Sequence, residues 1–127
     1  MIRIFIVDDD QSLQRLYSLI LKEAGCEITA IAIDGKDALD KYKSMKEKPD
    51  IVLMDHRMPI KSGLDAMDEI LKINRNEKIV FASADITVKE KAMNHGAIAF
   101  LDKPFKMHKL LNTIKFISKE LTIQSKH

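Results

Sequence analysis

The sequence predicts a doubly wound α/β fold, in which a five-stranded parallel sheet is covered by helices on both faces. Five short apolar segments rich in β-branched residues alternate with five segments whose apolar residues recur at helical spacing. One strand segment, residues 51–54, has no polar alternation, which is typical of a strand buried on both faces. Because neighbouring parallel strands need right-handed crossovers, the alternation favours helices on both sides of one sheet.

Length and composition indicate a single globular domain spanning residues 1–127. With 46% hydrophobic and 31% charged residues, the chain can bury a core without metals or disulfides. Its formal charge of +2 comes from 21 basic and 19 acidic residues scattered along the chain, so no direct nucleic-acid binding is expected. Cys26 is the only cysteine, and neither a signal peptide nor a membrane-inserting stretch is evident, so we expect a cytoplasmic protein.

The first strand–helix unit begins at the N-terminus. Residues 2–7 predict a strand that ends in three aspartates, and Asp10 or Gln11 begins the helix that follows. Gly25 is placed to end this helix. The expected apolar face of the helix consists of Leu13, Leu16, Tyr17, Ile20 and Ala24.

The second and third units follow in the same order. Residues 27–33 predict a strand, and a helix runs from the turn or cap at Asp34 to a lysine-rich stretch before Pro49. The buried apolar run described above is the third strand, and it carries Asp55 at its end. Ser62 is a candidate N-cap for the third helix, whose apolar residues are Leu64, Met67, Ile70, Leu71 and Ile73.

The last two units complete the alternation. Residues 78–82 predict the fourth strand, and a short helix over residues 87–95 follows it. Residues 97–101 predict the fifth strand. The apolar spacing over residues 107–121 then predicts a long amphipathic helix near the C-terminus.

Polar side chains suited to binding a phosphoryl group follow four of the five predicted strands. They are Asp8 and Asp9 after the first, Asp55 after the third, Ser83 after the fourth and Lys103 after the fifth. The carboxyl ends of parallel strands meet at one edge of the sheet, so these residues should converge in one cleft. Several carboxylates in one place repel, and a divalent cation relieves the repulsion. An all-oxygen site of this kind suits Mg²⁺.

The same set of residues predicts phosphoryl transfer. A metal ion and Lys103 would neutralise the phosphoryl oxygens, while the Ser83 hydroxyl donates a hydrogen bond. The nucleophile in such a reaction is a carboxylate, and Asp55 is the candidate. The expected product is an aspartyl phosphate.

These motifs together resemble the receiver domain of two-component response regulators. The matching residues are Asp8-Asp9, Asp55 with Met58-Pro59 and Gly63 behind it, Ser83-Ala84, and Lys103-Pro104-Phe105. The resemblance covers essentially the whole chain, in order and with the family's spacing. It implies a flavodoxin-like (βα)5 fold with sheet order 2-1-3-4-5, and a stand-alone receiver domain over residues 1–127, similar to the chemotaxis regulators and without an output domain.

The resemblance also implies a role for each site residue. Asp55 is the phosphoacceptor, and Asp9 and Asp55 bind Mg²⁺ directly, while Asp8 acts through water. The backbone carbonyl of Arg57 is a further metal ligand, and Mn²⁺ can substitute for Mg²⁺. Ser83, Ala84 and Lys103 surround the phosphoryl group, and the peptide bond before Pro104 is expected to be cis.

Two further features come from comparison with the family pattern. Phe100 occupies the place of an aromatic residue that turns inward on activation in many members, and an ordinary strand aromatic is an equally good interpretation. Arg57 and Asp85 take the positions that tune the lifetime of the phosphoryl group. We hypothesise that they pair and hinder water, although two solvated side chains would also fit.

The predicted function is therefore a phosphorylation switch and not an enzyme. Only self-catalysed phosphoryl transfer and slow autodephosphorylation are expected. A histidine kinase or phosphotransfer protein would supply the phosphoryl group, and output would go to an unidentified protein partner or into a phosphorelay. We expect a monomer or a weak dimer.

Two alternatives remain open at this point. A small Mg²⁺-dependent phosphohydrolase of the haloacid dehalogenase type would use Asp8 as its nucleophile, but it needs another acidic pair after its lysine, and beyond Lys103 the only acid is Glu120. A receiver-like interaction module that is never phosphorylated would be expected to lack one of the key residues.

Overall fold

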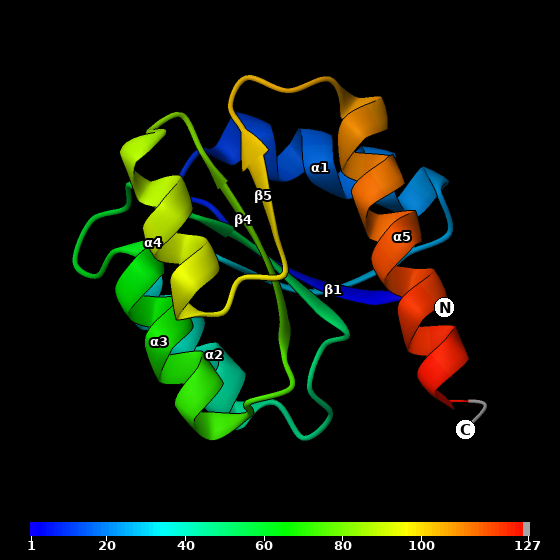
Figure 1. Cartoon of the computed structure of the whole chain (residues 1–127), viewed down its shortest axis with the longest axis horizontal. Helices are drawn as coiled ribbons and strands as arrows, with labels where there is room; N and C mark the ends of the chain where they lie inside the picture. The colour runs from blue at the N-terminus through cyan, green and yellow to red at the C-terminus, as the bar shows by residue number, and fades with distance from the viewer. Residues whose placement is uncertain (126–127) are drawn as a thin grey trace.

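The computed structural model describes residues 1–125, with side chains for residues 1–120, and confirms the predicted architecture (Figure 1). The described residues form a parallel sheet in the order β2-β1-β3-β4-β5 and five helices. The strands are β1 (Arg3–Val7), β2 (Glu27–Ala32), β3 (Ile51–Asp55), β4 (Lys78–Ser83) and β5 (Ala99–Asp102). The helices are α1 (Gln11–Glu23), α2 (Gly35–Ser44), α3 (Gly63–Ile73), α4 (Thr87–His95) and α5 (Met107–Ser125).

The two faces of the sheet carry separate hydrophobic cores. Helices α1 and α5 cover one face, and α2, α3 and α4 cover the other (Figure 1). Alternate residues of β1 divide between the cores: Phe5 and Val7 join the side of α2 to α4, whereas Ile4 and Ile6 join the side of α1 and α5. Every residue of β3 is buried, as predicted for the central strand of a doubly wound sheet.

The ends of the helices follow the predicted cap residues. Asp10 caps α1 by accepting hydrogen bonds from the backbone N–H groups of Ser12 and Leu13. Asp34 and Ser62 cap α2 and α3 in the same way, each through the N–H group three residues later. These caps place three helix N-termini at the edge of the sheet where the strands end.

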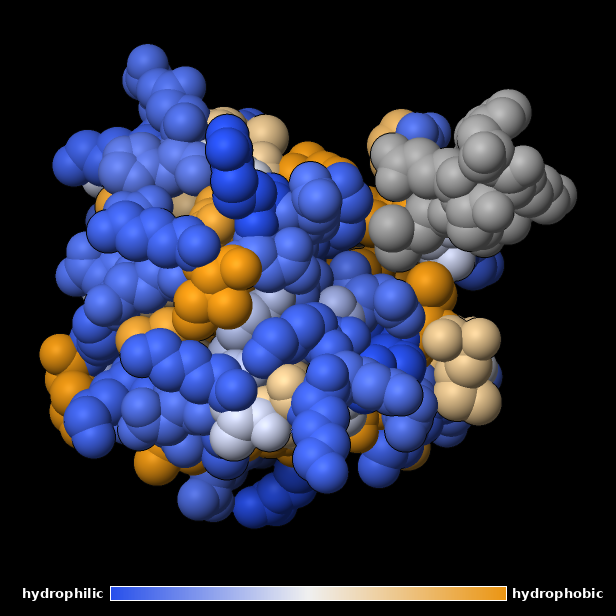
Figure 2. All heavy atoms as spheres, turned by 90° about the horizontal axis from the view of Figure 1, so that it is seen from below, coloured by the Kyte–Doolittle hydropathy of each residue, from blue (hydrophilic) through white to orange (hydrophobic). Residues whose placement is uncertain are grey.

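The opposite edge of the sheet is mainly hydrophilic (Figure 2). Figure 2 views the molecule from below, toward the ends of α2 and α3, and shows mainly hydrophilic residues there. None of the helices within residues 1–125 combines the length and the apolar character needed to cross a membrane.

Some strand bounds and one helix face were predicted wrongly: β2 ends at Ala32 and not at residue 33, and β4 extends to Ser83 and not only to residue 82. Strand β5 begins at Ala99 and not at residue 97, because Gly96, at φ 118°, and Ala97 complete the end of α4 by donating to the Met93 and Ala92 carbonyls. The buried face of α1 is centred on Tyr17 and Leu21, while Leu16 is 40% exposed and Ala24 is exposed as well. The side chain of Leu121, predicted on the apolar face of α5, lies outside the described residues.

Gly63 fixes the start of α3 against the end of β3. A Cβ atom at this position would lie 1.9 Å from the Asp55 carbonyl oxygen, and the Gly63 N–H donates to the His56 carbonyl oxygen at 2.9 Å. Only a residue without a side chain allows this approach. The backbone that carries Asp55 is therefore held by direct contact with α3.

We predict that Gly63→Ala lowers the free energy of unfolding by roughly 3 kcal/mol, because the added methyl group meets backbone atoms that cannot turn away. Urea unfolding followed by circular dichroism measures this. Gly25→Ala is the control, since Gly25 has φ +91° but nothing within 4 Å of its added Cβ atom, and it should cost about 1 kcal/mol from backbone strain alone. Equal losses in the two variants would contradict the steric explanation.

Candidate functional site

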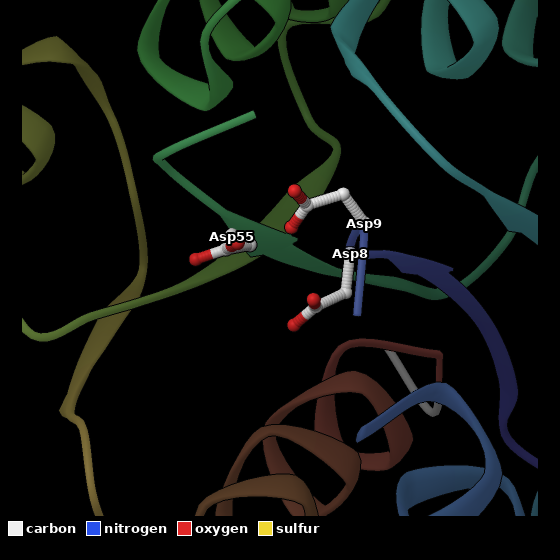
Figure 3. Close-up of side chains that lie close together, drawn as sticks. All are labelled: Asp8, Asp9 and Asp55. Atoms are coloured by element: carbon white, nitrogen blue, oxygen red, sulfur yellow. The ribbon is translucent and has the colours of Figure 1, made fainter. Parts of the chain in front are cut away.

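Three aspartates converge at the carboxyl edge of the sheet. Asp8 and Asp9 follow β1, and Asp55 is the last residue of β3. One oxygen from each carboxylate can be chosen so that all lie within 4.8 Å of one another. Figure 3 shows the three carboxyl groups around a common space. Asp8 and Asp55 are buried, whereas Asp9 is exposed.

Lys103, which directly follows β5, contacts two of these carboxylates. Its Nζ donates to Oδ2 of Asp8 at 3.1 Å and to Oδ1 of Asp55 at 3.2 Å. The Lys103 backbone N–H also donates to the Ser83 carbonyl oxygen at 2.9 Å, which fixes the loop after β5. The peptide bond between Lys103 and Pro104 is cis. Residues from β1, β3, β4 and β5 therefore share one polar cluster.

Burial and charge act in opposite directions at this cluster. Burial raises the pKa of Asp55 above its usual 3.8, while Lys103 lowers it and Asp8 raises it further. Burial also opposes the charge of Lys103, but Asp55 and Asp8 outweigh it and raise the pKa of Lys103 above 10.5. The arrangement thus keeps the ammonium charged between two carboxylates.

The donor set fits a hard divalent cation. Both oxygens of Asp8 already accept hydrogen bonds, Oδ1 from the Asp10 N–H at 2.9 Å and Oδ2 from Lys103. Asp9 and Asp55 have oxygens that face the common space (Figure 3). Mg²⁺ takes only one or two protein carboxylates and keeps several waters. At most two of the three carboxylates would then bind such an ion directly, and the third would be reached through water.

The predicted phosphoryl-binding residues Ser83 and Ala84 lie at the end of β4 and directly after it, on the strand that pairs with β3. In the pairing of β3 with β4, Asp55 lies opposite Ala82, so Ser83 is the next residue along. Ser83 is buried, and its Oγ accepts a hydrogen bond from the Asp85 N–H at 3.1 Å. Ala84 lines a pocket that also contains Lys103.

Arg57 and Asp85 face each other from neighbouring loops. The Arg57 guanidinium lies 3.4 Å from Oδ2 of Asp85, and 81% of the Arg57 side chain is exposed. Hydrogen bonds from Thr87 and the nearby Arg57 lower the pKa of Asp85. The two side chains thus pair, as hypothesised from the sequence, although an exposed pair of this kind contributes little to stability.

Phe100 is half-buried on β5 and stacks on Phe81 of β4. The two ring centroids are 6.1 Å apart and the rings are nearly parallel, at 17°. Phe81 is fully buried in the core on the side of α2 to α4. The predicted switch residue therefore has a defined aromatic neighbour inside the sheet.

Sequence reasoning missed an apolar pocket beside Lys103. The pocket has a volume of about 320 Å³, and α1 and the loop after β5 form most of it. Its lining residues are Leu13, Leu16, Tyr17, Ala84, Lys103, Pro104, Phe105 and Met107. Tyr17 stacks on Phe105 with ring centroids 6.1 Å apart, and burial raises its pKa to about 12, against the effect of Lys103. The one signal for it in the sequence is the pair Leu13 and Leu16 on the predicted apolar face of α1.

Fold and site together define a doubly wound domain with an acidic, lysine-bridged cluster at the carboxyl edge of its sheet. The sequence model of the response regulator receiver domain family matches residues 4–115. The chain therefore belongs to the response regulator receiver domain family, whose members are phosphoacceptor switches of two-component systems.

Individual relatives agree with this assignment. The chemotaxis protein CheY of Thermotoga maritima is 38% identical over 119 residues, which cover 92% of this chain and 98% of that protein. CheY of Treponema pallidum is 34% identical, over 92% of this chain and 83% of that protein.

Solved structures show the same architecture. The response regulator TrrA of Thermotoga maritima in complex with Mg²⁺ and beryllofluoride has a TM-score of 0.83 and 32% identity. The match covers 92% of this chain and 99% of TrrA. A CheX–CheY–BeF3–Mg²⁺ complex from Borrelia burgdorferi has a TM-score of 0.86 at 27% identity, over 91% of this chain and 88% of the matched chain.

We predict that Lys103→Met raises the pKa of Asp55 further, because the charge that lowers it is gone while burial and Asp8 remain. Carboxyl ¹³C NMR titration measures this. The free energy of unfolding should fall by roughly 3 kcal/mol at neutral pH, where two buried carboxylates lose their partner. A carboxyl whose folded pKa is raised destabilises the fold above its unfolded pKa, so this loss should shrink as the pH falls towards 3.8.

Lys106→Met is the matched control for this substitution. Lys106 is exposed and lies three residues further along the chain. It should leave both the pKa of Asp55 and the stability nearly unchanged. The same Asp55 titration curve in both variants would show that Lys103 does not set the pKa.

Proposed function

We propose that this chain is a phosphorylation switch in which Asp55 accepts a phosphoryl group from a histidine kinase or a phosphotransfer protein, in a Mg²⁺-dependent reaction. The observation that most supports the proposal is the bridge from Lys103 to both Asp8 and Asp55 within the acidic cluster. A purely structural ion pair between Lys103 and one carboxylate would not require two further aspartates beside it. The whole set suits a metal ion and a phosphoryl group together.

Each residue then has a defined part in the transfer. An Asp55 carboxylate oxygen forms a bond to phosphorus as the bond from phosphorus to the donor histidine nitrogen breaks, and that nitrogen keeps the electron pair. Lys103 neutralises charge on the phosphoryl oxygens, and the Ser83 hydroxyl donates to one of them. Asp9, Asp55 and the Arg57 carbonyl would hold Mg²⁺, which when bound shields the incoming phosphoryl oxygens from the carboxylates.

The surface around Asp55 suits a protein donor. The apolar pocket between α1 and the loop after β5 reaches Lys103, so an apolar side chain of a donor could enter it while the phosphoryl group meets Asp55. Leu16 is 40% exposed at this pocket. The new charge on Asp55 would then bias the surface formed by α4, β5 and α5, through which a downstream protein or a phosphorelay receives the signal.

Incubation with Mg²⁺ and acetyl phosphate tests the central step. The parent protein should gain one phosphoryl group by intact mass spectrometry, and Asp55→Asn should gain none. Asp8→Asn should weaken Mg²⁺ binding measured by calorimetry, whereas Asp10→Asn, at the cap of α1, should leave it unchanged. Turnover of phosphomonoesters that depends on Asp8 would instead favour the phosphohydrolase. Phosphorylation of Asp55→Asn at the parental rate would contradict the proposal.

The Arg57–Asp85 pair is expected to slow hydrolysis of the phosphoryl group by restricting the approach of water. We predict that the Arg57→Ala, Asp85→Ala double variant loses phosphate faster than the parent, by about threefold or more, given the modest strength of exposed pairs. Release of phosphate from protein labelled with ³²P measures the rate. Lys36→Ala, Asp40→Ala removes a comparable exposed pair on α2 and should not change it. A double variant no faster than the parent would exclude this role.

A further inference from the structure

His56 directly follows Asp55, and its backbone is tied to the site on both sides. Its N–H is hydrogen-bonded to the Asp55 carboxyl group, which lowers the pKa of Asp55. Its carbonyl oxygen accepts from the Gly63 N–H at 2.9 Å. A movement of the Asp55 carboxylate therefore displaces the His56 backbone. The hydrogen bond from Gly63 at the start of α3 limits how far that backbone can shift.

The His56 side chain points into the protein and contacts an aromatic residue. Its ring centroid lies 5.7 Å from that of Phe81, with the rings tilted by 43°. Its Nδ1 is buried and has no hydrogen-bond partner among the described residues. A buried polar atom without a partner costs free energy. The ring packs against Phe81 instead.

Phe81, on β4, connects this histidine to Phe100 on the neighbouring strand β5. It is fully buried and stacks on Phe100, which is half-buried on β5. Three rings therefore lie in series, from the residue beside Asp55 to the aromatic that faces α4. Protein interiors are close-packed, so a ring enclosed like that of Phe81 cannot shift without displacing its neighbours. A change in position at one end of the series alters the space available at the other.

We propose that His56 is a positioning residue whose ring, through Phe81, couples the position of Phe100 to the state of Asp55. The coupling rests on the proposed function, since it needs a charged ligand at Asp55. A ligand there pulls on the hydrogen bond from the His56 N–H, the imidazole ring moves with its backbone, Phe81 shifts with the imidazole ring, and Phe100 takes the space that this opens. In this mechanism the packing of the three rings transmits the signal.

Fluorine NMR of protein containing 4-fluorophenylalanine tests the coupling. The sequence has five phenylalanines, so five signals are expected, and Phe100→Leu assigns the one of interest. Spectra with Mg²⁺ alone and with Mg²⁺ and beryllofluoride give the population of the shifted Phe100 conformer. In His56→Ala this population ratio should fall by about threefold or more, within the range of measured couplings between residues. His56→Phe keeps a ring against Phe81 and should retain most of the parental response.

Further variants distinguish a loss of the coupling from a general loss of folded structure. His56→Leu keeps the volume but not the ring and should behave like His56→Ala, which covers the case in which the alanine variant does not fold. Phe81→Leu should also reduce the response, and adding His56→Leu to it should cause no further loss, because both act through one contact. His108→Ala, at an exposed histidine on α5, should leave the Phe100 signal unchanged.

The outcomes distinguish this proposal from the one on which it rests. Phosphorylation of Asp55 by acetyl phosphate is measured by mass spectrometry on every sample. If the parent is not phosphorylated, the proposed function fails and the coupling with it. If the parent is phosphorylated but the His56→Ala and His56→Leu variants give the parental Phe100 response, only the coupling is overturned. Additive losses in the double variant would overturn it as well.

Discussion

The double ion pair of Lys103 with Asp8 and Asp55 is the interaction on which the site depends. These partners are 95 and 48 residues away in the sequence, and they stand at the ends of β1 and β3. Without the ammonium group, two buried carboxylates would face each other with nothing to balance them. The Ser83 carbonyl oxygen, which accepts from the Lys103 N–H, fixes the loop that brings the lysine there. The Lys103 side chain thus links the carboxyl ends of β1, β3 and β5.

Another buried carboxyl group, that of Glu77, has a different environment from that of Asp55. Glu77 lies just before β4, at the opposite edge of the sheet, where it accepts hydrogen bonds from the Tyr42 hydroxyl at 2.8 Å and from the Lys78 N–H. Burial raises its pKa, and these neutral donors oppose the shift. Glu77 is stabilised mainly by these hydrogen bonds, with smaller and opposite effects from Asp50 and Lys48, whereas Asp55 accepts a hydrogen bond directly from the Lys103 ammonium group. A direct ion pair with a largely buried lysine therefore distinguishes Asp55 from Glu77.

The loop between β3 and α3 combines close contact with backbone strain. Gly63 presses α3 against the Asp55 carbonyl oxygen. Ile60, in the same loop, has φ 71° and is 78% exposed, although a β-branched residue disfavours this conformation. Such strain persists only where the surroundings enforce it, and it is common at functional sites. This loop also carries His56 and Arg57, the two residues that directly follow Asp55.

The sequence alone determined the alternation of strands and helices, the cap residues Asp10, Asp34 and Ser62, and the aspartates, serine and lysine at the strand ends. These follow from local periodicity and from the rule that parallel strands end at one edge. The family resemblance added the strand order. Only the tertiary structure decided which face of α1 is buried, where β5 begins, and that His56 lies against Phe81. Those features depend on contacts between distant segments, and several helix faces or strand starts satisfy the same local pattern equally well until the neighbouring side chains are in place.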